Sequence, residues 1–257
     1  MLTLKTPLEK GSKKLINAWA FYDWANSVYS LVISSAIFPI YFGVLFSDIN
    51  TISFFNYDIK NTAVISFVTA SAFLIVAFIS PILSGIADYI GNKKKFMKIF
   101  VYLGSTSCVG LYWFELETIY IGLLFYFLAL IGLWSSIVFY NSYLPDIAFP
   151  EQQDRVSARG YSYGYIGSVI LLLMNLAMVM QPDLFGIEGT SSEASMKAMK
   201  YSFISVGIWW ALFSQYSFYF LPKSNHEVRV TKDIFWNGYK ELRSVWKQLK
   251  GQTQLKH

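Results

Sequence analysis

Polar residues recur along the first long apolar segment of the sequence at a spacing that could line a path for a solute or a proton. They follow one another at steps of three, one, three and four residues, which places their side chains on one face of an α-helix. The set is Asp23, Asn26, Ser27, Ser30 and Ser34. An ionisable side chain at membrane depth is costly and points to function. The positive end of a helix would also stabilise Asp23, so a structural role and a role in the path carry equal weight.

Small residues in the fifth apolar segment are spaced for close helix packing. Gly160, Gly164 and Ser168 recur every four residues, and small side chains on one face allow two helices to approach closely in lipid. Asn175 continues the same face. Its amide could bind a neighbouring helix or a solute in a cavity, and the spacing does not separate these two roles.

A short stretch at the end of the second apolar segment combines an acidic residue, glycines and lysines. Asp88 lies at the C-terminal end of the predicted helix, where the helix dipole disfavours an anion, so it requires a compensating partner. Gly91 allows a tight reversal of the chain, and Gly85, Lys93 and Lys94 complete the motif. We expect a latch at the cytoplasmic gate, because a donor that is available in only one conformation would favour that conformation.

The connection between the fourth and fifth apolar segments is unusually rich in charge and proline. It runs from residue 141 to residue 160 and contains Asp154, Arg155 and Arg159. We expect these three residues to form a charged cytoplasmic loop that belongs to the same gate.

The residue types that carry metal binding or nucleophilic catalysis are scarce. The two histidines, His226 and His257, lie in the C-terminal tail, and Cys108 is the single cysteine. Neither a His-based triad nor a ligand cluster can therefore form within the apolar segments. We expect no metal site, no cofactor and no enzymatic activity.

Long apolar helices must position these residues. Hydrophobic residues make up 54% of the 257 residues and charged residues only 14%, a balance beyond that of soluble domains. A helix needs about 20 apolar residues to cross the hydrocarbon core. Six segments reach or approach that length, at residues 18–46, 63–87, 96–114, 118–140, 161–180 and 201–221. The sequence therefore predicts an all-α membrane protein with six transmembrane helices.

Basic residues gather on one side of the predicted bundle. All but three of the 21 Lys and Arg residues fall in the N-terminal arm, the second and fourth connections or the C-terminal tail; the exceptions are Lys60, Lys197 and Lys200. Basic flanks mark the cytoplasmic side of a membrane protein. We expect both termini in the cytoplasm and the protein in the plasma (inner) membrane. The net charge of +5 is then explained by attraction to anionic lipid headgroups, so a nucleic-acid partner is not needed to explain it.

The chain divides into three parts. Residues 1–17 form a basic cytoplasmic arm, residues 18–221 the transmembrane bundle and residues 222–257 a cytoplasmic tail. Apolar residues recur at steps of four and three between residues 231 and 250, with basic residues between them, which predicts an amphipathic helix on the membrane surface. A surface linker is the preferred interpretation, and a regulatory target for a partner is the alternative.

Several stretches resemble a known family. The segment 84–95 is similar to the loop between the second and third helices of major facilitator superfamily transporters, with matches at Asp88, Gly91 and Lys93. Residues 21–27 (Phe-Tyr-Asp-Trp-Ala-Asn-Ser), 36–42 (Ala-Ile-Phe-Pro-Ile-Tyr-Phe), 144–148 (Leu-Pro-Asp-Ile-Ala) and 154–160 (Asp-Arg-Val-Ser-Ala-Arg-Gly) resemble the vacuole-effluxer branch of that superfamily. This branch includes autophagy-related amino-acid exporters.

The resemblance implies a secondary transporter that works by alternating access around a site near the middle of the membrane. It further implies export or exchange of a small polar solute, with amino acids as one candidate class. A membrane receptor or scaffold that does not transport is one alternative. A membrane-embedded enzyme is the less favoured one, because the apolar segments hold no histidine or ligand cluster.

The resemblance covers the first half of a typical twelve-helix member, so we expect the chain to supply one half of a major-facilitator-type bundle. Polar groups on the first and fifth segments would need a facing wall, because polar groups left toward lipid cost several kcal/mol each. We expect that wall to be a second six-helix half that this fragment lacks. A homodimer of halves is the less favoured alternative.

Overall fold

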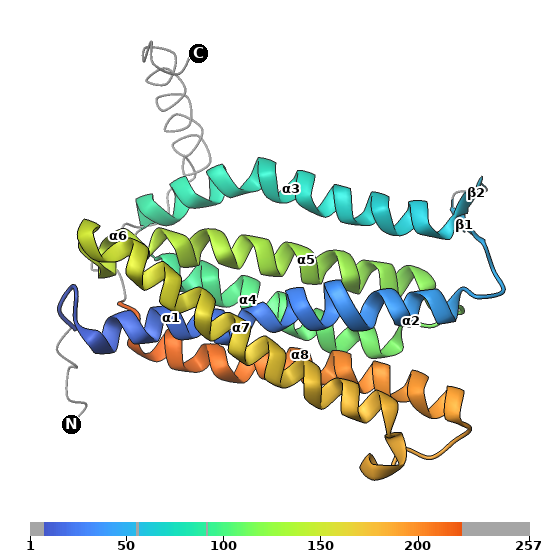
Figure 1. The fold of residues 1–257 in the computed structure, drawn as a ribbon. Coiled ribbons are helices and arrows are strands. Elements are labelled where there is room, and N and C mark those ends of the chain that lie inside the picture. The colour runs from blue at the N-terminus through green and yellow to red at the C-terminus, as the bar shows by residue number, and fades with distance from the viewer. Residues whose placement is uncertain (1–7, 55–56, 91, 223–257) are drawn as a thin grey trace, which may run out of the picture.

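The computed structural model describes residues 8–54, 57–90 and 92–222 of the chain. The elements are α1 (Lys13–Val28), η1 (Tyr29–Ile37), α2 (Phe38–Leu45), β1 (Thr51–Phe54), β2 (Tyr57–Lys60), α3 (Asn61–Ile90), α4 (Lys93–Gly110), η2 (Leu111–Trp113), α5 (Ile119–Ser142), α6 (Leu144–Ile147), α7 (Pro150–Met180), η3 (Pro182–Phe185) and α8 (Ser191–Phe220) (Figure 1). Gly91, the amphipathic segment 231–250 and the side chains of residues 84–90 lie outside the described residues. The predictions made for them stay predictions.

Four helical segments of the described residues are long and apolar enough to cross a membrane. They are Lys13–Leu45, which joins α1, η1 and α2, then Asn61–Leu83 within α3, Ile119–Ile147 and Pro150–Met180. Neither α4 nor α8 meets the same test of length, hydropathy and charge. The predicted class of an all-α membrane protein is therefore confirmed, whereas the count of six spans stays a prediction.

The connection after α2 contains a short β-hairpin, which the residue pattern did not predict. β1 and β2 pair antiparallel, with Thr51 opposite Lys60 and Ile52 opposite Ile59. Ile52 is buried while its neighbour Ser53 is exposed, as expected for a strand with one buried face. Strands of four residues are too short to give a clear periodic signal in the sequence.

Two helices begin earlier than hydropathy indicates, so the connections 141–160 and 181–200 are shorter than predicted. α7 begins at Pro150, a residue that suits the first helical position because its missing N–H needs no partner there. α8 begins after a capping box in which Thr190 and Glu193 bond each other reciprocally. Polar residues at the membrane surface can continue a helix without contributing to its hydropathy.

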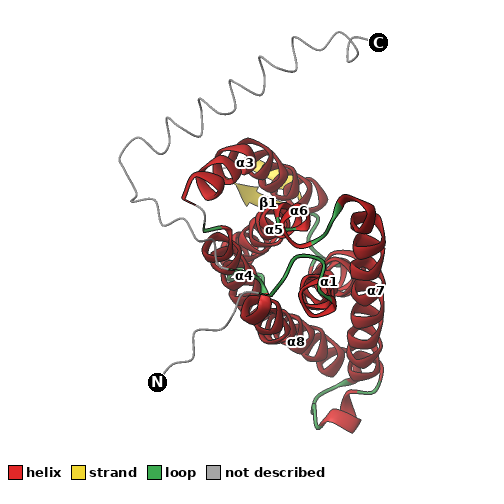
Figure 2. Ribbon diagram, turned by 90° about the vertical axis from the view of Figure 1, so that its left-hand side faces the viewer, coloured by secondary structure: helices red, strands yellow, loops and turns green. Residues whose placement is uncertain are grey.

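The helices form one bundle with α1 in its interior (Figure 2). α1 packs along α7 and α8, α4 packs between α5 and α8, and α3 rests mainly on α5. α4 and α5 come into backbone contact, because a Cβ added to Gly132 would lie 2.5 Å from the Cα of Gly104. Small residues at such crossings allow this close approach in lipid.

α3 lies at the edge of the bundle (Figure 1). Only 17% of its most apolar stretch is buried, and its large side chains Phe67, Leu74 and Phe78 are exposed. An apolar face of this size requires lipid or a further protein surface against it.

The first span changes from an α-helix to a π-helix and back. At the end of η1 the backbone N–H of Phe38 bonds to the carbonyl of Ile33, five residues earlier. π-Helical segments are rare and are frequent at functional sites. Because the wider turn interrupts the α-helical period, the predicted polar stripe does not stay on one face of the span.

Candidate functional site

The carboxylate of Asp23 lies where α1, α5 and α7 meet. Its Oδ2 accepts a hydrogen bond of 2.9 Å from the hydroxyl of Tyr140 on α5. Its Oδ1 accepts a longer one of 3.4 Å from the amide of Asn26, which also donates to the carbonyl of Tyr22 at 2.8 Å. α7 comes so close that a Cβ at Gly160 would lie 2.4 Å from Oδ2. The acidic residue of the predicted stripe therefore lies between helices and is partly exposed.

Tyr140 joins α5 to α1 through further contacts. Its backbone carbonyl accepts a hydrogen bond of 2.9 Å from the indole N–H of Trp19, and the two rings stack with centroids 4.2 Å apart. Tyr22 donates to the hydroxyl of Ser136 at 2.7 Å, and its ring lies 4.9 Å from that of Tyr140. No spacing marks Tyr140 in the sequence, because a tyrosine within an apolar segment has the same pattern as a packing residue.

α7 presents its small residues to α1. A Cβ at Gly164 would lie 2.5 Å from the hydroxyl oxygen of Ser27, and one at Gly167 would lie 2.9 Å from the ring of Trp24. Ser168 donates back to the carbonyl of Gly164 at 2.6 Å, which satisfies its hydroxyl within the helix. α1 thus lies in a groove of α7 that larger residues would fill.

The other polar residues predicted for the path lie apart from this carboxylate. Ser30 is exposed, and Ser34 faces a separate cavity. Asn175 accepts a hydrogen bond of 2.9 Å from Ser205 of α8, while its buried Nδ2 has no hydrogen-bond partner among the described residues. The structure therefore divides the stripe between different surroundings, and its role in a solute path stays a prediction.

A cavity of about 620 Å³ lies between the first span, α3 and α5. Its wall combines apolar and aromatic side chains with five hydroxyl residues, which are Ser34, Thr62, Ser66, Thr69 and Tyr126. Sites for small molecules commonly combine an apolar wall with a few polar groups. The hydroxyl residues of α3 were absent from the sequence prediction, although their steps of four and three residues place them on one helix face.

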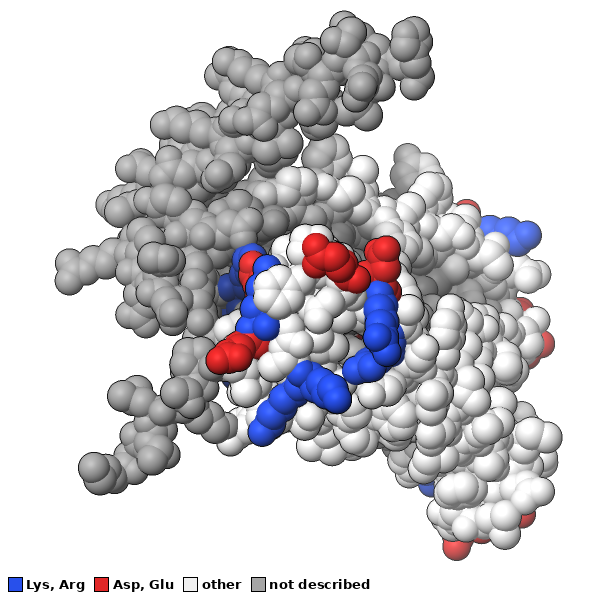
Figure 3. Space-filling view, turned by 60° about the vertical axis from the view of Figure 1, so that its left-hand side comes forward, with Lys and Arg blue, Asp and Glu red and all other residues white. Residues whose placement is uncertain are grey.

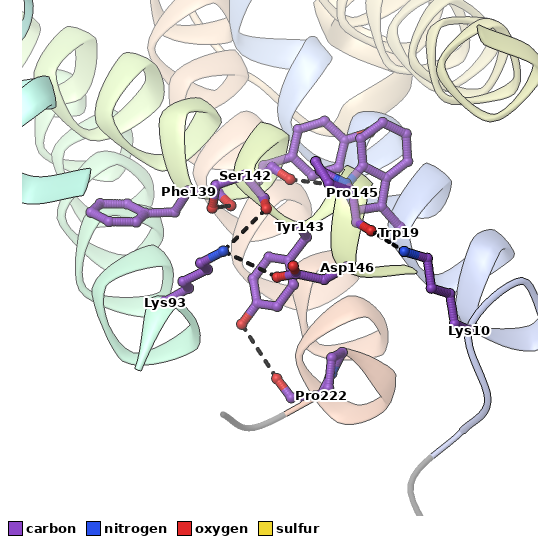
Figure 4. A network of polar contacts seen from close by, with 10 residues as sticks. Lys10, Trp19, Lys93, Phe139, Ser142, Tyr143, Pro145, Asp146 and Pro222 are labelled. Carbon is purple, nitrogen blue, oxygen red and sulfur yellow. Dashed lines mark hydrogen bonds and ion pairs between the residues drawn. The ribbon is translucent and has the colours of Figure 1, made fainter. Parts of the chain in front are cut away.

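Charged side chains gather at one end of the bundle, where α1, α4 and α7 begin (Figure 3). Lys93 of the predicted gate motif forms an ion pair with Asp146 of α6, at 3.0 Å between Nζ and Oδ2, and donates to the carbonyl of Ser142 at 3.3 Å (Figure 4). Lys10 of the N-terminal arm donates to the carbonyl of Pro145 at 2.6 Å. These contacts join the N-terminal arm, α4, α5 and α6.

The second lysine of the motif reaches the end of α8. Lys94 is buried and donates to the carbonyl of Leu221 at 2.5 Å, while Tyr143 donates to the carbonyl of Pro222 at 3.3 Å (Figure 4). Gly85 lies with the aspartate of the motif near the C-terminal end of α3. The lysines thus have partners within this bundle, and the latch role of the aspartate stays a prediction.

The charged residues predicted for a cytoplasmic loop lie on α7 instead. Asp154 and Arg155 are exposed, and Arg159 donates to the side-chain oxygen of Asn17 on α1 at 2.8 Å. The loop assignment is therefore wrong, because a helix that extends beyond the hydrocarbon core needs no apolar residues there. The proposed gate role of these residues stays a prediction.

Within residues 8–54, 57–90 and 92–222, no group of three or more His, Cys, Asp or Glu side chains could hold a metal ion. Cys108 is buried and free. The site as described offers hydroxyls, amides and the partly buried carboxylate of Asp23, which are groups that bind and orient a solute or hold a proton.

Known proteins resemble this chain over most of its length. A family model described as "Vacuole effluxer Atg22 like" matches residues 11–256. The chain is 32% identical over 240 residues to the "Uncharacterized MFS-type transporter YxiO" of Bacillus subtilis (strain 168), which covers 91% of this chain and 52% of that protein. It is 28% identical over 175 residues to an "Uncharacterized protein" of Aquifex aeolicus (strain VF5), covering 67% of this chain and 41% of that protein.

The chain spans about half the length of the curated relatives it matches. No solved structure matches it. The family match includes the motif around Asp23, the stretch 84–95 and the helical region that begins at Pro150. By this match and by the identity to its Bacillus relative, the chain belongs to the Atg22-like vacuole effluxer family.

Proposed function

We propose that this chain forms one half of a secondary transporter that moves a small polar solute across the membrane by alternating access. The family match and the MFS-type transporter among its relatives support this class of function. Export or exchange of amino acids is the activity to test first, since the family model is described as an effluxer.

The cavity between the first span, α3 and α5 is the observation that carries this proposal. The hydroxyls of Thr69 and Tyr126 lie 3.5 Å apart at its wall, and Ser34 comes from the π-helical segment on the other side. Polar groups at membrane depth are costly and are commonly found where a solute is bound. The ring of Phe38 and other apolar side chains of the wall would contact the uncharged part of such a solute.

We infer that a second six-helix half completes the transporter. The exposed apolar side chains of α3 leave a surface on which a second half could pack in place of lipid, and the chain spans about half the length of its relatives. A homodimer of this chain is the less favoured arrangement. Either partner would enclose the cavity between two bundles.

The plasma (inner) membrane is the compartment that we propose, with both termini in the cytoplasm. Charged side chains gather at one end of the bundle (Figure 3), and basic residues at one end indicate the cytoplasmic side. The family is named after the vacuole, whereas the relatives reported above come from bacteria.

Reconstitution tests the transport class directly. The 257-residue chain and a version extended by the downstream reading frame are purified, placed in liposomes and loaded with a mixture of labelled amino acids. We expect efflux from the extended version and none from the chain alone. Absence of flux from both, for amino acids and for other polar solutes, would contradict the transport class. Flux from a monomer of the 257-residue chain would contradict the need for a second half.

A substitution in the cavity tests the binding site. Thr69→Val keeps the side-chain shape and removes a hydroxyl that faces the cavity, so the half-saturation concentration should rise about 2- to 12-fold for the loss of one hydrogen bond. Thr106→Val is the matched control, because the hydroxyls of Thr69 and Thr106 both donate to the backbone carbonyl four residues earlier, whereas Thr106 is exposed on α4 and does not line the cavity. Equal effects of the two substitutions would show that this cavity does not bind the solute.

A further inference from the structure

The hydrogen-bond partners of Asp23 among the described residues are neutral. The residue lies within the candidate span Lys13–Leu45. The hydroxyl of Tyr140 donates to one carboxylate oxygen at 2.9 Å and the amide of Asn26 to the other at 3.4 Å. A carboxylate at membrane depth is costly unless it pairs with a cation or faces water. The charge state of Asp23 therefore affects the stability of the contact between α1 and α5.

The titratable groups around Asp23 are engaged elsewhere or exposed. On α7, Arg159 donates to Asn17 at 2.8 Å, and Tyr161 is exposed. On α1, the hydroxyl of Tyr22 donates to α5, while α8 contributes aromatic side chains to its contact with α1. Among the residues that the structure describes, no lysine or arginine forms an ion pair with this carboxylate.

Asp23 is partly exposed, and the space between its carboxylate and α7 is too narrow for a ligand larger than a proton. A single added Cβ at Gly160 would lie 2.4 Å from Oδ2. Asp23 also lines neither of two cavities, of about 430 and 620 Å³, that border α3. A calcium or magnesium ion requires about six oxygen ligands, and the ammonium group of a solute requires an adjoining cavity. A proton requires neither.

We propose that Asp23 takes up and releases a proton during the transport cycle and thereby couples solute movement to a proton gradient. This inference rests on the proposed transport function. When charged, Asp23 accepts a hydrogen bond from Tyr140. When protonated, it keeps one acceptor oxygen but gains an O–H, while its two present partners, Tyr140 and Asn26, are both donors. The oxygen that carries the proton therefore needs a new acceptor, and the donor beside it has to turn or move away. The polar contacts where α1 meets α5 then differ between the two protonation states, which is the condition for coupling.

Infrared difference spectroscopy tests proton binding without any transport. The purified 257-residue chain is placed in liposomes and acidified, and the C=O stretch of protonated carboxyl groups is recorded. We expect a band that Asp23→Asn removes and that Asp146→Asn, at the half-exposed ion pair with Lys93, leaves in place. Tyr140→Phe should shift this band to higher frequency, because it removes the hydroxyl that contacts the carboxyl group. The proposal is wrong if no band depends on Asp23 anywhere in the pH range in which the chain stays folded.

Flux measurements separate this proposal from the proposed function. In liposomes that contain the extended protein, Asp23→Asn should still exchange solute across the membrane but should lose accumulation driven by a pH gradient. Equal accumulation by Asp23→Asn and by the unmodified protein would overturn the coupling. Absence of flux from the unmodified protein would contradict transport itself and, with it, the coupling; the infrared band would still decide whether Asp23 binds a proton.

Discussion

Replacing Gly132 by alanine should force α4 and α5 apart. A Cβ at Gly132 would lie 2.5 Å from both the Cα and the N of Gly104, and 2.7 Å from the carbonyl oxygen of Phe100. These are backbone atoms, which no change of rotamer can move. Since non-bonded heavy atoms are most stable at about 3.5 Å or more, the two helices must separate locally by about 1 Å.

The cost of this separation exceeds the gain from alanine. A gap of about 1 Å removes up to half of the dispersion energy at each contact. Overpacking costs about 1–3 kcal/mol, and the upper end applies because the atoms opposite are backbone. Alanine gains about 1 kcal/mol over glycine within a helix. We therefore expect Gly132→Ala to lower the free energy of unfolding by about 2 kcal/mol.

Unfolding in mixed micelles with increasing dodecyl sulfate, followed by tryptophan fluorescence, measures this loss. Gly43→Ala is the control, because a Cβ at that position meets no atom within 4 Å. Its free energy of unfolding should stay unchanged or rise by up to about 1 kcal/mol. Equal stability of the two variants would refute the backbone contact between α4 and α5.

Tyr140→Phe removes a donor to the carboxylate of Asp23 and should lower the free energy of unfolding by about 1–3 kcal/mol in the same assay. The control Tyr102→Phe removes an exposed hydroxyl bonded to Gln215 and should change it by less than about 0.5 kcal/mol; equal losses would argue against the described contact. The pKa of Glu193 lies below its ordinary value because the backbone N–H and the hydroxyl of Thr190 donate to it. The contacts between Glu193 and Thr190 therefore stabilise the folded state above the ordinary glutamate pKa, and this stabilisation is lost as the pH falls through the lowered value. Glu193→Gln should reduce the acid-induced part of unfolding. An unchanged acid profile would contradict this cause.

Hydropathy predicts the helices that are apolar over their whole length. α5 was expected at residues 118–140 and occupies Ile119–Ser142, and α3 was expected at 63–87 and occupies Asn61–Ile90. The start of α7 was missed because its first turns, from Pro150 to Arg159, are polar. Helix formation there depends on capping and on contact with α1, and neither contributes to an apolar window.

The site could be predicted only in part. Asp23 was found because a charged residue within an apolar segment is visible in the sequence. Its partner Tyr140 lies 117 residues away, and helical periodicity relates only residues on the same helix. Ser34 belongs to the π-helical segment η1 and lines the cavity, which Asp23 does not; a fixed α-helical period cannot anticipate a π-helical turn.

The distance along the chain between Asp23 and Tyr140 has a consequence for synthesis. A ribosome adds about 5–20 residues per second, so the 117 residues between the two take about 6–23 s. During that interval α1 has left the ribosome while the hydroxyl that binds its carboxylate does not yet exist. Insertion of α1 must therefore tolerate for seconds an aspartate whose side-chain partner is Asn26 of the same helix, and slower translation of the intervening segment lengthens this interval. The contact between Asp23 and Tyr140 can therefore form only once α5 has been made.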